Sequence, residues 1–269
     1  MNRTRGAALL LVLRLVTLLA ALVGAFALTA RTEHLQGQVL ARGLEARAAA
    51  RAGIEYAVVR AGSSDPRSRW AADGSEHPWQ FGDAAVSVRI VDEQGKVDLN
   101  MADAGLIASL LQQLGADDRT AAGVAGAILD WRDADPLTQP AGGAEDPEYR
   151  AAGRGYGPAN EPLRSVAEVE QVLGVTPQLY ARMAPFVTVY SGLAVPETAH
   201  APPPVRAAMG MSGPPPPVVA GNSGTYSIES RASIRGRTAV LRVVVRSGGN
   251  GLPGSAWTPL RWEEGASPR

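Results

Sequence analysis

Hydrophobic residues dominate the start of the chain, where residues 7–30 are apolar except for Arg14 and two threonines. At about 1.5 Å per residue, a helix of this length spans roughly 36 Å, enough to cross a hydrocarbon core of about 30 Å. Residues 35–60 are rich in good helix formers and repeat hydrophobic side chains on one face, namely Leu40, Leu44, Ile54 and Val58. The pattern predicts one long helix, apolar all round at first and amphipathic later, ended by the turn-forming residues 62–82.

Strand-like alternation of hydrophobic and polar residues follows the helix. Residues 86–99 alternate from Val86 onward and are predicted to form a hairpin with its turn at Glu93–Gly95. The same pattern returns near the C-terminus, at residues 226–234, 238–245 and 258–262. These segments predict a small antiparallel sheet interrupted by a long stretch of another kind.

Between the strand segments the hydrophobic period becomes helical. One pair of helices is predicted around the break at residues 114–118 (LGADD), and a second pair around residues 173–177 (LGVTP). Residues 130–162, between the pairs, are rich in acids, Gly and Pro and have no regular pattern. Residues 192–223 contain PPP and PPPP runs and are predicted to form a flexible, partly polyproline II linker or projecting loop.

The order of these segments predicts an α+β fold in which a long N-terminal helix packs on a small antiparallel sheet. An all-helical domain, resembling a sterile-alpha-motif or helix-hairpin-helix unit, is inserted in the sheet. The expected divisions are a leader at 1–6, a membrane-spanning part at 7–30, the rest of the helix and first strands at 31–99, the inserted domain at 100–190, the Pro-rich loop at 191–223 and the closing strands at 224–269.

The residues before the apolar run indicate how the chain is oriented and processed. Arg3 and Arg5 precede the run, so the positive-inside tendency keeps the N-terminus cytoplasmic and places the bulk of the chain in the periplasm. The candidate cleavage point, between Gly6 and Ala7, lies before the apolar run, whereas a secretory signal peptide is cut after it. Processing there would leave the helix on the mature protein. Arg14 is costly in lipid, and snorkelling to the cytoplasmic surface is its simplest explanation.

Composition removes several classes of function. Lys+Arg and Asp+Glu both number 26, so no broad attraction to nucleic acid is implied, and the absence of cysteine excludes thiol regulation. The segments VDLNMADAGLIASLLQQLG and LRSVAEVEQVLGV resemble helix-hairpin-helix modules, which hold phosphate on backbone amides. Asp117 and Asp118 stand at that hairpin and would repel phosphate. A helical packing unit without nucleic acid is therefore favoured over a membrane-anchored DNA-binding protein.

Acidic residues gather in the loop between the helical pairs. Asp133, Asp135, Glu145 and Asp146 are the candidate metal ligands, with Asp130 and Glu148 able to reach through water. Carboxylates at flexible spacing suit Ca²⁺, whereas zinc would require His or Cys. The EF-hand pattern is absent, and a merely solvated acidic loop remains the alternative. His34, His77 and His200 have no acid or nucleophile partner in their segments, so an enzyme is not expected.

Motifs spread over nearly the whole chain resemble the minor pseudopilin K family of the bacterial type II secretion system. They are RGAALLLVL, EQGKVDLNMA, ILDWRDAD, GGAEDPEYRAAGRGYGPANEPLRSVAEVEQVLGV and YSIESRASIRGRTAVLRVVVRSG. Most pseudopilins carry glutamate as the fifth mature residue, where this chain has Leu11. Among pseudopilins, the K family looks like the exception to this rule, so the departure supports the resemblance. A subunit without that carboxylate suits the filament tip. A type IV pilus minor pilin is the remaining alternative.

The resemblance implies a function and a set of partners. It implies cleavage after Gly6 by the prepilin peptidase, methylation of Ala7, and a single-pass protein of the inner membrane. It also implies a tip complex with minor pseudopilins I and J that initiates and caps the periplasmic pseudopilus. Calcium bound in the inserted domain is a further implication.

Overall fold

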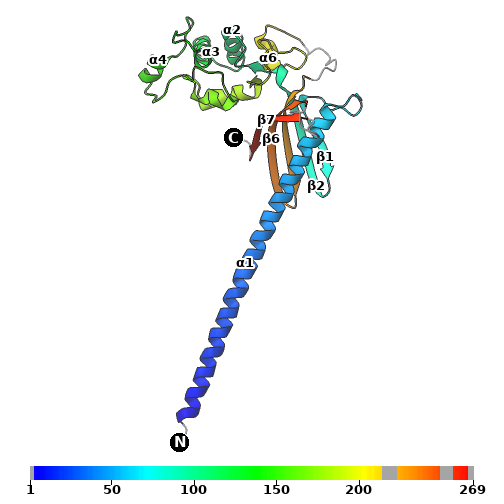
Figure 1. Cartoon of the computed structure of the whole chain (residues 1–269), viewed down its shortest axis with the longest axis vertical. Coiled ribbons are helices and arrows are strands. Elements are labelled where there is room, and N and C mark those ends of the chain that lie inside the picture. Colours follow the sequence, from blue (N-terminus) through cyan, green and yellow to red (C-terminus); the bar gives the residue numbers. More distant parts are fainter. Residues whose placement is uncertain (1–2, 214–222, 249–256, 266–269) are drawn as a thin grey trace.

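The computed structural model of the chain describes the backbone of residues 3–213, 223–248 and 257–265, with side chains from residue 11 onward. Its N-terminal helix, α1, runs unbroken over 59 residues from Arg3 to Ala61. Figure 1 shows α1 as a stalk that projects far below the rest of the molecule. Every residue from 11 to 42 is exposed, and the first buried side chain along the helix is Ala46. The predicted single helix is confirmed.

The upper part of α1 lies against an antiparallel sheet of five strands in the order β1-β2-β5-β6-β7. The strands are β1 (Asp73–Phe81), β2 (Ala84–Asp92), β5 (Thr225–Ile234), β6 (Arg237–Ser247) and β7 (Trp257–Glu264). Inward-facing side chains of β2, β5 and β6 alternate along each strand and close over α1 in one core, which includes Ile54, Val88, Ile228 and Val243. The predicted strands at 226–234, 238–245 and 258–262 correspond to β5, β6 and β7.

The helical domain is inserted between β2 and β5 and sits at the end of the molecule opposite the N-terminus (Figure 1). It contains α2 (Ala104–Gln113), α3 (Asp118–Arg132), α4 (Asp146–Ala151), η2 (Val166–Gln171), α5 (Pro177–Met183), η3 (Ala184–Phe186) and α6 (Pro203–Ala208). A short parallel ladder of β3 (Val97–Asp98) and β4 (Val187–Thr188) closes its base. Its hydrophobic core is separate from that of the sheet, as residues 97–205 supply its fully buried members.

Three sequence predictions for the sheet and its connections need correction. Residues 86–99 do not form a hairpin, because β2 pairs with β1 on one side and β5 on the other. Glu93–Gly95 is a 3-10 turn, η1, that leads into the inserted domain. Residues 62–82 are not all turn, because β1 occupies the last part; its Gly74 and Pro78 concealed the strand pattern.

The irregular segments of the inserted domain also hold more structure than their patterns predicted. The loop at 130–162 contains the short helix α4, and the Pro-rich segment contains α6 before residue 213. Residues 166–171 form a 3-10 helix rather than an α-helix. Residues 214–222, with the PPPP run, lie outside the described part of the chain.

Candidate functional site

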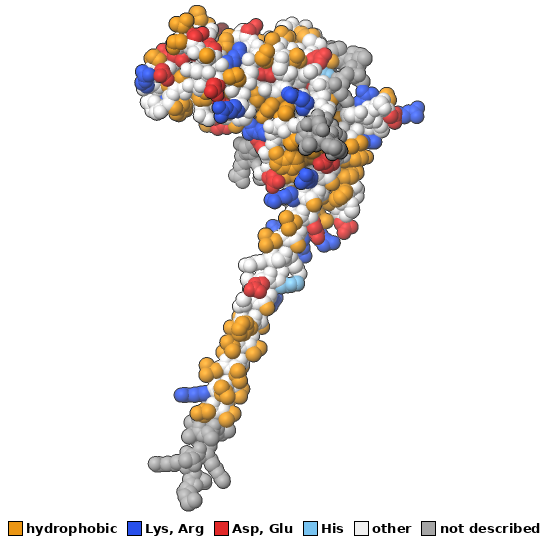
Figure 2. Space-filling view, viewed as in Figure 1, with side chains coloured by type: hydrophobic (Ala, Val, Ile, Leu, Met, Phe, Trp, Pro, Cys, Tyr) orange, Lys and Arg blue, Asp and Glu red, His pale blue; other side chains and the backbone are white. Residues whose placement is uncertain are grey.

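The expected processing point lies at the start of α1. Gly6 and Ala7 are both in the helix that begins at Arg3. Above them, α1 is the one helix of the described residues that is long and apolar enough to cross a membrane. No residue of its most apolar stretch is buried against the rest of the described chain. The exposed lower part of α1 forms a largely hydrophobic surface, interrupted by a basic side chain (Figure 2). Within the described residues, nothing covers this surface, and an exposed apolar surface of this kind suits contact with a membrane or with another protein.

The acidic loop begins inside α3 and ends at the start of α4. Asp130 is on the buried face of α3, and its carboxylate accepts hydrogen bonds from the backbone N–H of Gln139 (3.2 Å) and of Ala144 (2.7 Å). Gly143 lies directly against this carboxylate, since a Cβ there would be 2.1 Å from Oδ2 of Asp130. Asp130 therefore folds the loop back onto α3 by binding backbone amides.

Two of the predicted ligands carry unpaired buried oxygens. Within the described residues, Oδ1 of Asp133 and Oε1 of Glu145 are buried without a hydrogen-bond partner. Burial is the main cause that raises the pKa of both carboxyl groups, and neighbouring carboxylates raise it further: Asp135 acts on Asp133, and Asp130 on Glu145. A buried carboxylate oxygen without a donor is costly, and coordination of a cation is one way to satisfy such an oxygen.

The other predicted ligands have different partners. Asp135 accepts the N–H of Leu137 (2.9 Å), and Asp146 forms an exposed ion pair with Arg150 (2.9 Å). Glu148 accepts the N–H of Glu145 (2.9 Å) at the start of α4. Across the described residues, no group of three or more acidic or His side chains is arranged to hold a metal ion. The structure thus brings the loop acids into one region, where one oxygen of Asp133 and one oxygen of Glu145 are buried without a donor.

The hairpin between α2 and α3 has a carboxylate where a phosphate would have to bind. Asp117 precedes α3 and accepts hydrogen bonds from the backbone N–H (2.9 Å) and hydroxyl (2.7 Å) of Thr120. The backbone hydrogen bond from Thr120 is the main cause that lowers the pKa of Asp117. The anion site that a helix N-terminus offers is therefore occupied by the chain's own side chain.

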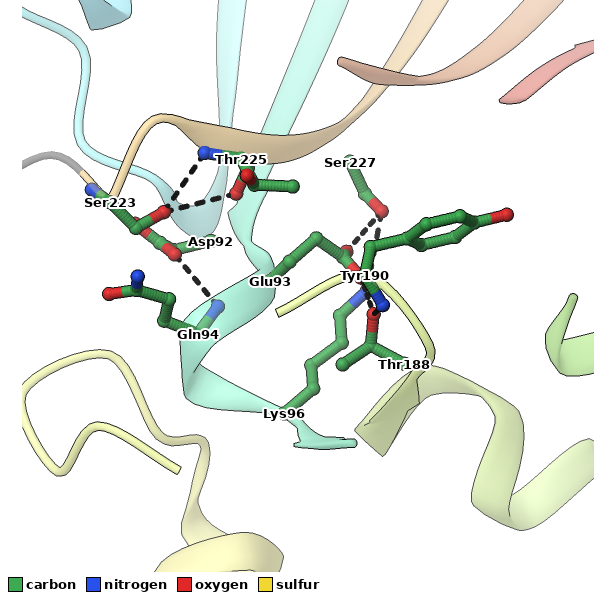
Figure 3. Close-up of polar contacts among 9 residues, drawn as sticks. All are labelled: Asp92, Glu93, Gln94, Lys96, Thr188, Tyr190, Ser223, Thr225 and Ser227. Carbon is green, nitrogen blue, oxygen red and sulfur yellow. Dashed lines mark hydrogen bonds and ion pairs between the residues drawn. The ribbon is translucent and has the colours of Figure 1, made fainter. Parts of the chain in front are cut away.

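A buried ion pair at the junction between sheet and insertion was not predicted. Nζ of Lys96 lies 2.5 Å from Oε1 of Glu93, and their side chains are only 10% and 2% exposed. Glu93 also accepts hydrogen bonds from the hydroxyls of Ser227 in β5 and Thr188 in β4. Figure 3 shows these groups converging on Glu93 from both domains. The sequence EQGK has the features of a solvated turn, and only the tertiary fold buries it.

A second set of contacts surrounds this pair. Asp92, at the end of β2, accepts the N–H of Gln94 (2.9 Å; Figure 3), and its Oδ2 lies 3.9 Å from Nε2 of His200. Gly95 faces the same segment, since a Cβ there would lie 2.2 Å from the carbonyl oxygen of His200. The junction is therefore a packed, hydrogen-bonded joint rather than a flexible tether.

Comparison with known proteins identifies the inserted domain. Residues 88–192 match the family described as type II secretion system (T2SS), protein K. Type II secretion system protein K of Klebsiella pneumoniae is 30% identical over 210 residues, and that of Pectobacterium carotovorum subsp. carotovorum 30% over 218 residues. Each match covers 69% of this chain and 63% of the relative, so the chain spans less than two thirds of their length.

A solved structure has the same fold. The crystal structure of the GspK-GspI-GspJ complex from the enterotoxigenic Escherichia coli type 2 secretion system contains a chain that matches 88% of this one, with 99% of its own length covered. The TM-score is 0.56 and the sequence identity 16%. This likeness shows the fold, in which the sheet is interrupted by a helical insertion.

Proposed function

We propose that the chain is a minor pseudopilin, a structural subunit of the periplasmic pseudopilus, because residues 88–192 match the protein K family of type II secretion systems. The observation that carries the proposal is the combination of a long exposed apolar helix with a sheet into which the family's domain is inserted. The helix provides the membrane anchor and later packs among other subunits. Arg3 and Arg5 keep its start cytoplasmic, and the sheet and insertion lie in the periplasm.

We further propose a position at the filament tip, which the shape of the molecule supports. The helical domain sits at the end of the molecule opposite the N-terminus (Figure 1). In a filament of parallel subunits, a domain there would obstruct a subunit added above. Leu11 supports the same position, because it leaves the chain without the carboxylate that would neutralise the terminal amine of a subunit above. Minor pseudopilins I and J are the proposed neighbours, supported by the complex in which the protein of the same fold was solved.

Purification of the complex tests this function. The soluble part, without residues 1–30, is expected to co-purify with pseudopilins I and J of the same system, and the full chain is expected near one copy per filament. Abundant protein along the shaft would contradict the tip assignment.

Maturation is tested on the full chain by intact mass. Cells with prepilin peptidase should yield a protein that begins at methylated Ala7, whereas Gly6→Val should remain uncut and cleavage near Ala30 would indicate a signal peptide.

The acidic loop is proposed to bind calcium as a structural ion. Asp133 and Glu145 supply the buried oxygens without donors, and Asp135 and Asp146 are the further candidate ligands. Gly142 has a positive φ of 109°, which only glycine adopts readily, and the adjacent backbone can offer carbonyl oxygens. A bound Ca²⁺ supplies positive charge that offsets the repulsion among the loop carboxylates and holds the loop on α3.

Thermal unfolding with and without a chelator tests the calcium proposal. Calcium at 100 times its dissociation constant is expected to stabilise the domain by about 2.7 kcal/mol, and magnesium to do so poorly because it demands a tighter octahedron. The double variant Asp133→Asn, Glu145→Gln should lose this gain but unfold no earlier than wild type in chelator. The matched control is Glu161→Gln, an exposed acid outside the loop. If the wild-type domain melts at the same temperature with and without calcium, the calcium proposal is wrong and the acids form a solvated loop.

A further inference from the structure

A hollow lies between α1 and the lower end of the sheet, just above the exposed stalk. Its cavity volume is about 930 Å³, and its walls are α1 on one side and the start of β6 with the end of β7 on the other. The apolar side chains that line it are Val39, Leu40, Leu44, Ala239, Val240 and Leu241. Leu40 and Leu44 are 69% and 63% exposed, so the described chain leaves this lining open. An apolar hollow of this size suits a ligand with a hydrocarbon part.

Three arginines surround the hollow. Arg47 comes from α1, Arg231 from β5 and Arg237 from β6. Glu264 is the acidic residue that lines it, and its carboxylate lies 3.3 Å from Arg47. Within the described residues, Arg237 forms no ion pair. Basic side chains are visible beside α1 where the stalk meets the rest of the molecule (Figure 2). The hollow thus combines an apolar wall with a rim of net positive charge.

The hollow lies close to the membrane-spanning part of α1. Val39, at its lower end, is nine residues beyond Ala30, about 13 Å along the helix. A shallow groove on α1 continues from the hollow toward the membrane and is lined by Thr32, Leu35, Gln36, Val39 and Leu40. The apolar run is about 36 Å long and exceeds a hydrocarbon core of about 30 Å, so α1 is expected to tilt. Tilt toward the hollow brings its lower end down to the headgroup layer, which is about 5–7 Å thick.

We propose that this hollow binds one anionic phospholipid of the membrane in which α1 is anchored. The phosphate lies against Arg237, at the end of β6 nearest the membrane, and an acyl chain descends past Leu40 along the groove on α1. A guanidinium matches a phosphate with paired hydrogen bonds, and basic pockets beside membrane-spanning helices suit anionic headgroups. The net positive rim therefore selects an anionic lipid over a zwitterionic one. The bound lipid holds the anchored subunit tilted toward the hollow.

The inference rests on one part of the proposed function, the anchoring of α1 in a membrane, and is tested without secretion. The full chain is reconstituted at low density in phosphatidylcholine vesicles. These contain a small fraction of either phosphatidylglycerol or phosphatidylcholine that carries a nitroxide on its acyl chain, next to the glycerol. Because the chain has no cysteine, Thr238→Cys accepts one fluorophore at the hollow, which the nitroxide quenches on contact. Gln113→Cys on α2, in the inserted domain, is the labelled control.

The expected result is stronger quenching at Thr238→Cys by the phosphatidylglycerol than by the phosphatidylcholine, and none at Gln113→Cys. Arg237→Gln should raise the fraction of labelled phosphatidylglycerol needed for half quenching by about threefold to tenfold, whereas Arg237→Lys should retain part of the preference. The matched control is Arg246→Gln, which removes an exposed arginine at the other end of β6 and should leave quenching unchanged. Leu44→Asn should weaken quenching by both lipids.

Three results would overturn the proposal in different ways. If both labelled lipids quench equally and Arg237→Gln changes neither, the hollow does not select an anionic lipid. If neither lipid quenches and unlabelled chain added to the vesicles changes the emission at Thr238→Cys, the hollow is an interface between copies. If the chain does not float with the vesicles, α1 is not inserted, so the anchoring part of the proposed function fails and the lipid site fails with it.

Discussion

Two glycines of α1 lie in different surroundings, and only one of them has a role in packing. Gly43 is in the open part of the helix, where an added Cβ would meet nothing within 4 Å. Gly53 lies against the sheet, where a Cβ would be 2.2 Å from Oγ of Ser230 and 2.9 Å from Cγ1 of Val86. Sequence alone indicates a weakened helix at both positions. The structure shows that Gly53 permits the close approach of α1 to β2 and β5.

Alanine at each glycine should therefore act in opposite directions. Gly43→Ala removes a poor helix former and should stabilise the protein by up to about 1 kcal/mol. Gly53→Ala gains the same propensity but overfills the core, which costs about 1–3 kcal/mol, so a net loss is expected. Melting curves of the two variants measure the difference. Because Oγ of Ser230 is buried without a hydrogen-bond partner in the described residues, Ser230→Ala should be tolerated and should partly rescue Gly53→Ala. Equal melting of both glycine variants would contradict the close approach.

At the scale of elements, the sequence predicted what local patterns determine. The long helix, α2, α3 and strands β5 to β7 follow from their hydrophobic periods. β1 was missed because Gly74 and Pro78 interrupt its alternation, and α4 because six residues give no period. Glu93 and Lys96 could not be found, since their burial depends on Ser227 and Thr188, which are far away in sequence. The sequence showed the acidic loop by its composition. Only the fold shows which carboxylate oxygens of that loop lack a hydrogen-bond donor.

The Glu93–Lys96 pair joins β2, β4 and β5 and should respond to mutation as a buried pair. Lys96→Met leaves the Glu93 carboxylate buried without its cation and should lower the free energy of unfolding by about 3–5 kcal/mol. Glu93→Leu leaves the Lys96 ammonium buried without its anion and should lower the free energy of unfolding by the same amount. The double variant replaces both charges by apolar groups and should cost less than the sum of the single changes. A double-mutant cycle from denaturant unfolding measures the coupling energy. The exposed pair Arg89–Glu76 serves as a control, for which less than about 1 kcal/mol is expected. Additive effects at Glu93 and Lys96 would show that the joint does not depend on the pair.

The whole molecule is built from two cores that use different parts of the chain. The sheet core takes its buried residues from 49–90 and 226–245, and the core of the insertion takes them from 97–205. The chain leaves the sheet after Asp92 and returns opposite it, since Asp92 pairs with Tyr226 in the β2–β5 ladder. The insertion therefore extends a hairpin connection, and its removal leaves two strand ends already in register. This arrangement lets the body formed by α1 and the sheet carry a bulky helical domain.

Excision of the insertion tests that independence. Replacing residues 93–225 of the soluble part with Asn-Gly should join β2 to β5 by a two-residue turn, because Asn-Gly favours the turn type that matches strand twist. The shortened protein is expected to retain strand content and unfold cooperatively, at a lower temperature because the buried end of the sheet loses its cover. Circular dichroism and limited proteolysis provide the measurements, with Gly-Ala in the turn as a less favourable control. A chain that stays unfolded with both turns would show that the sheet requires the insertion. On the proposed function, an excised full-length chain that also carries Leu11→Glu should appear along the pseudopilus shaft in secreting cells, because both proposed obstacles to a subunit above it are then removed.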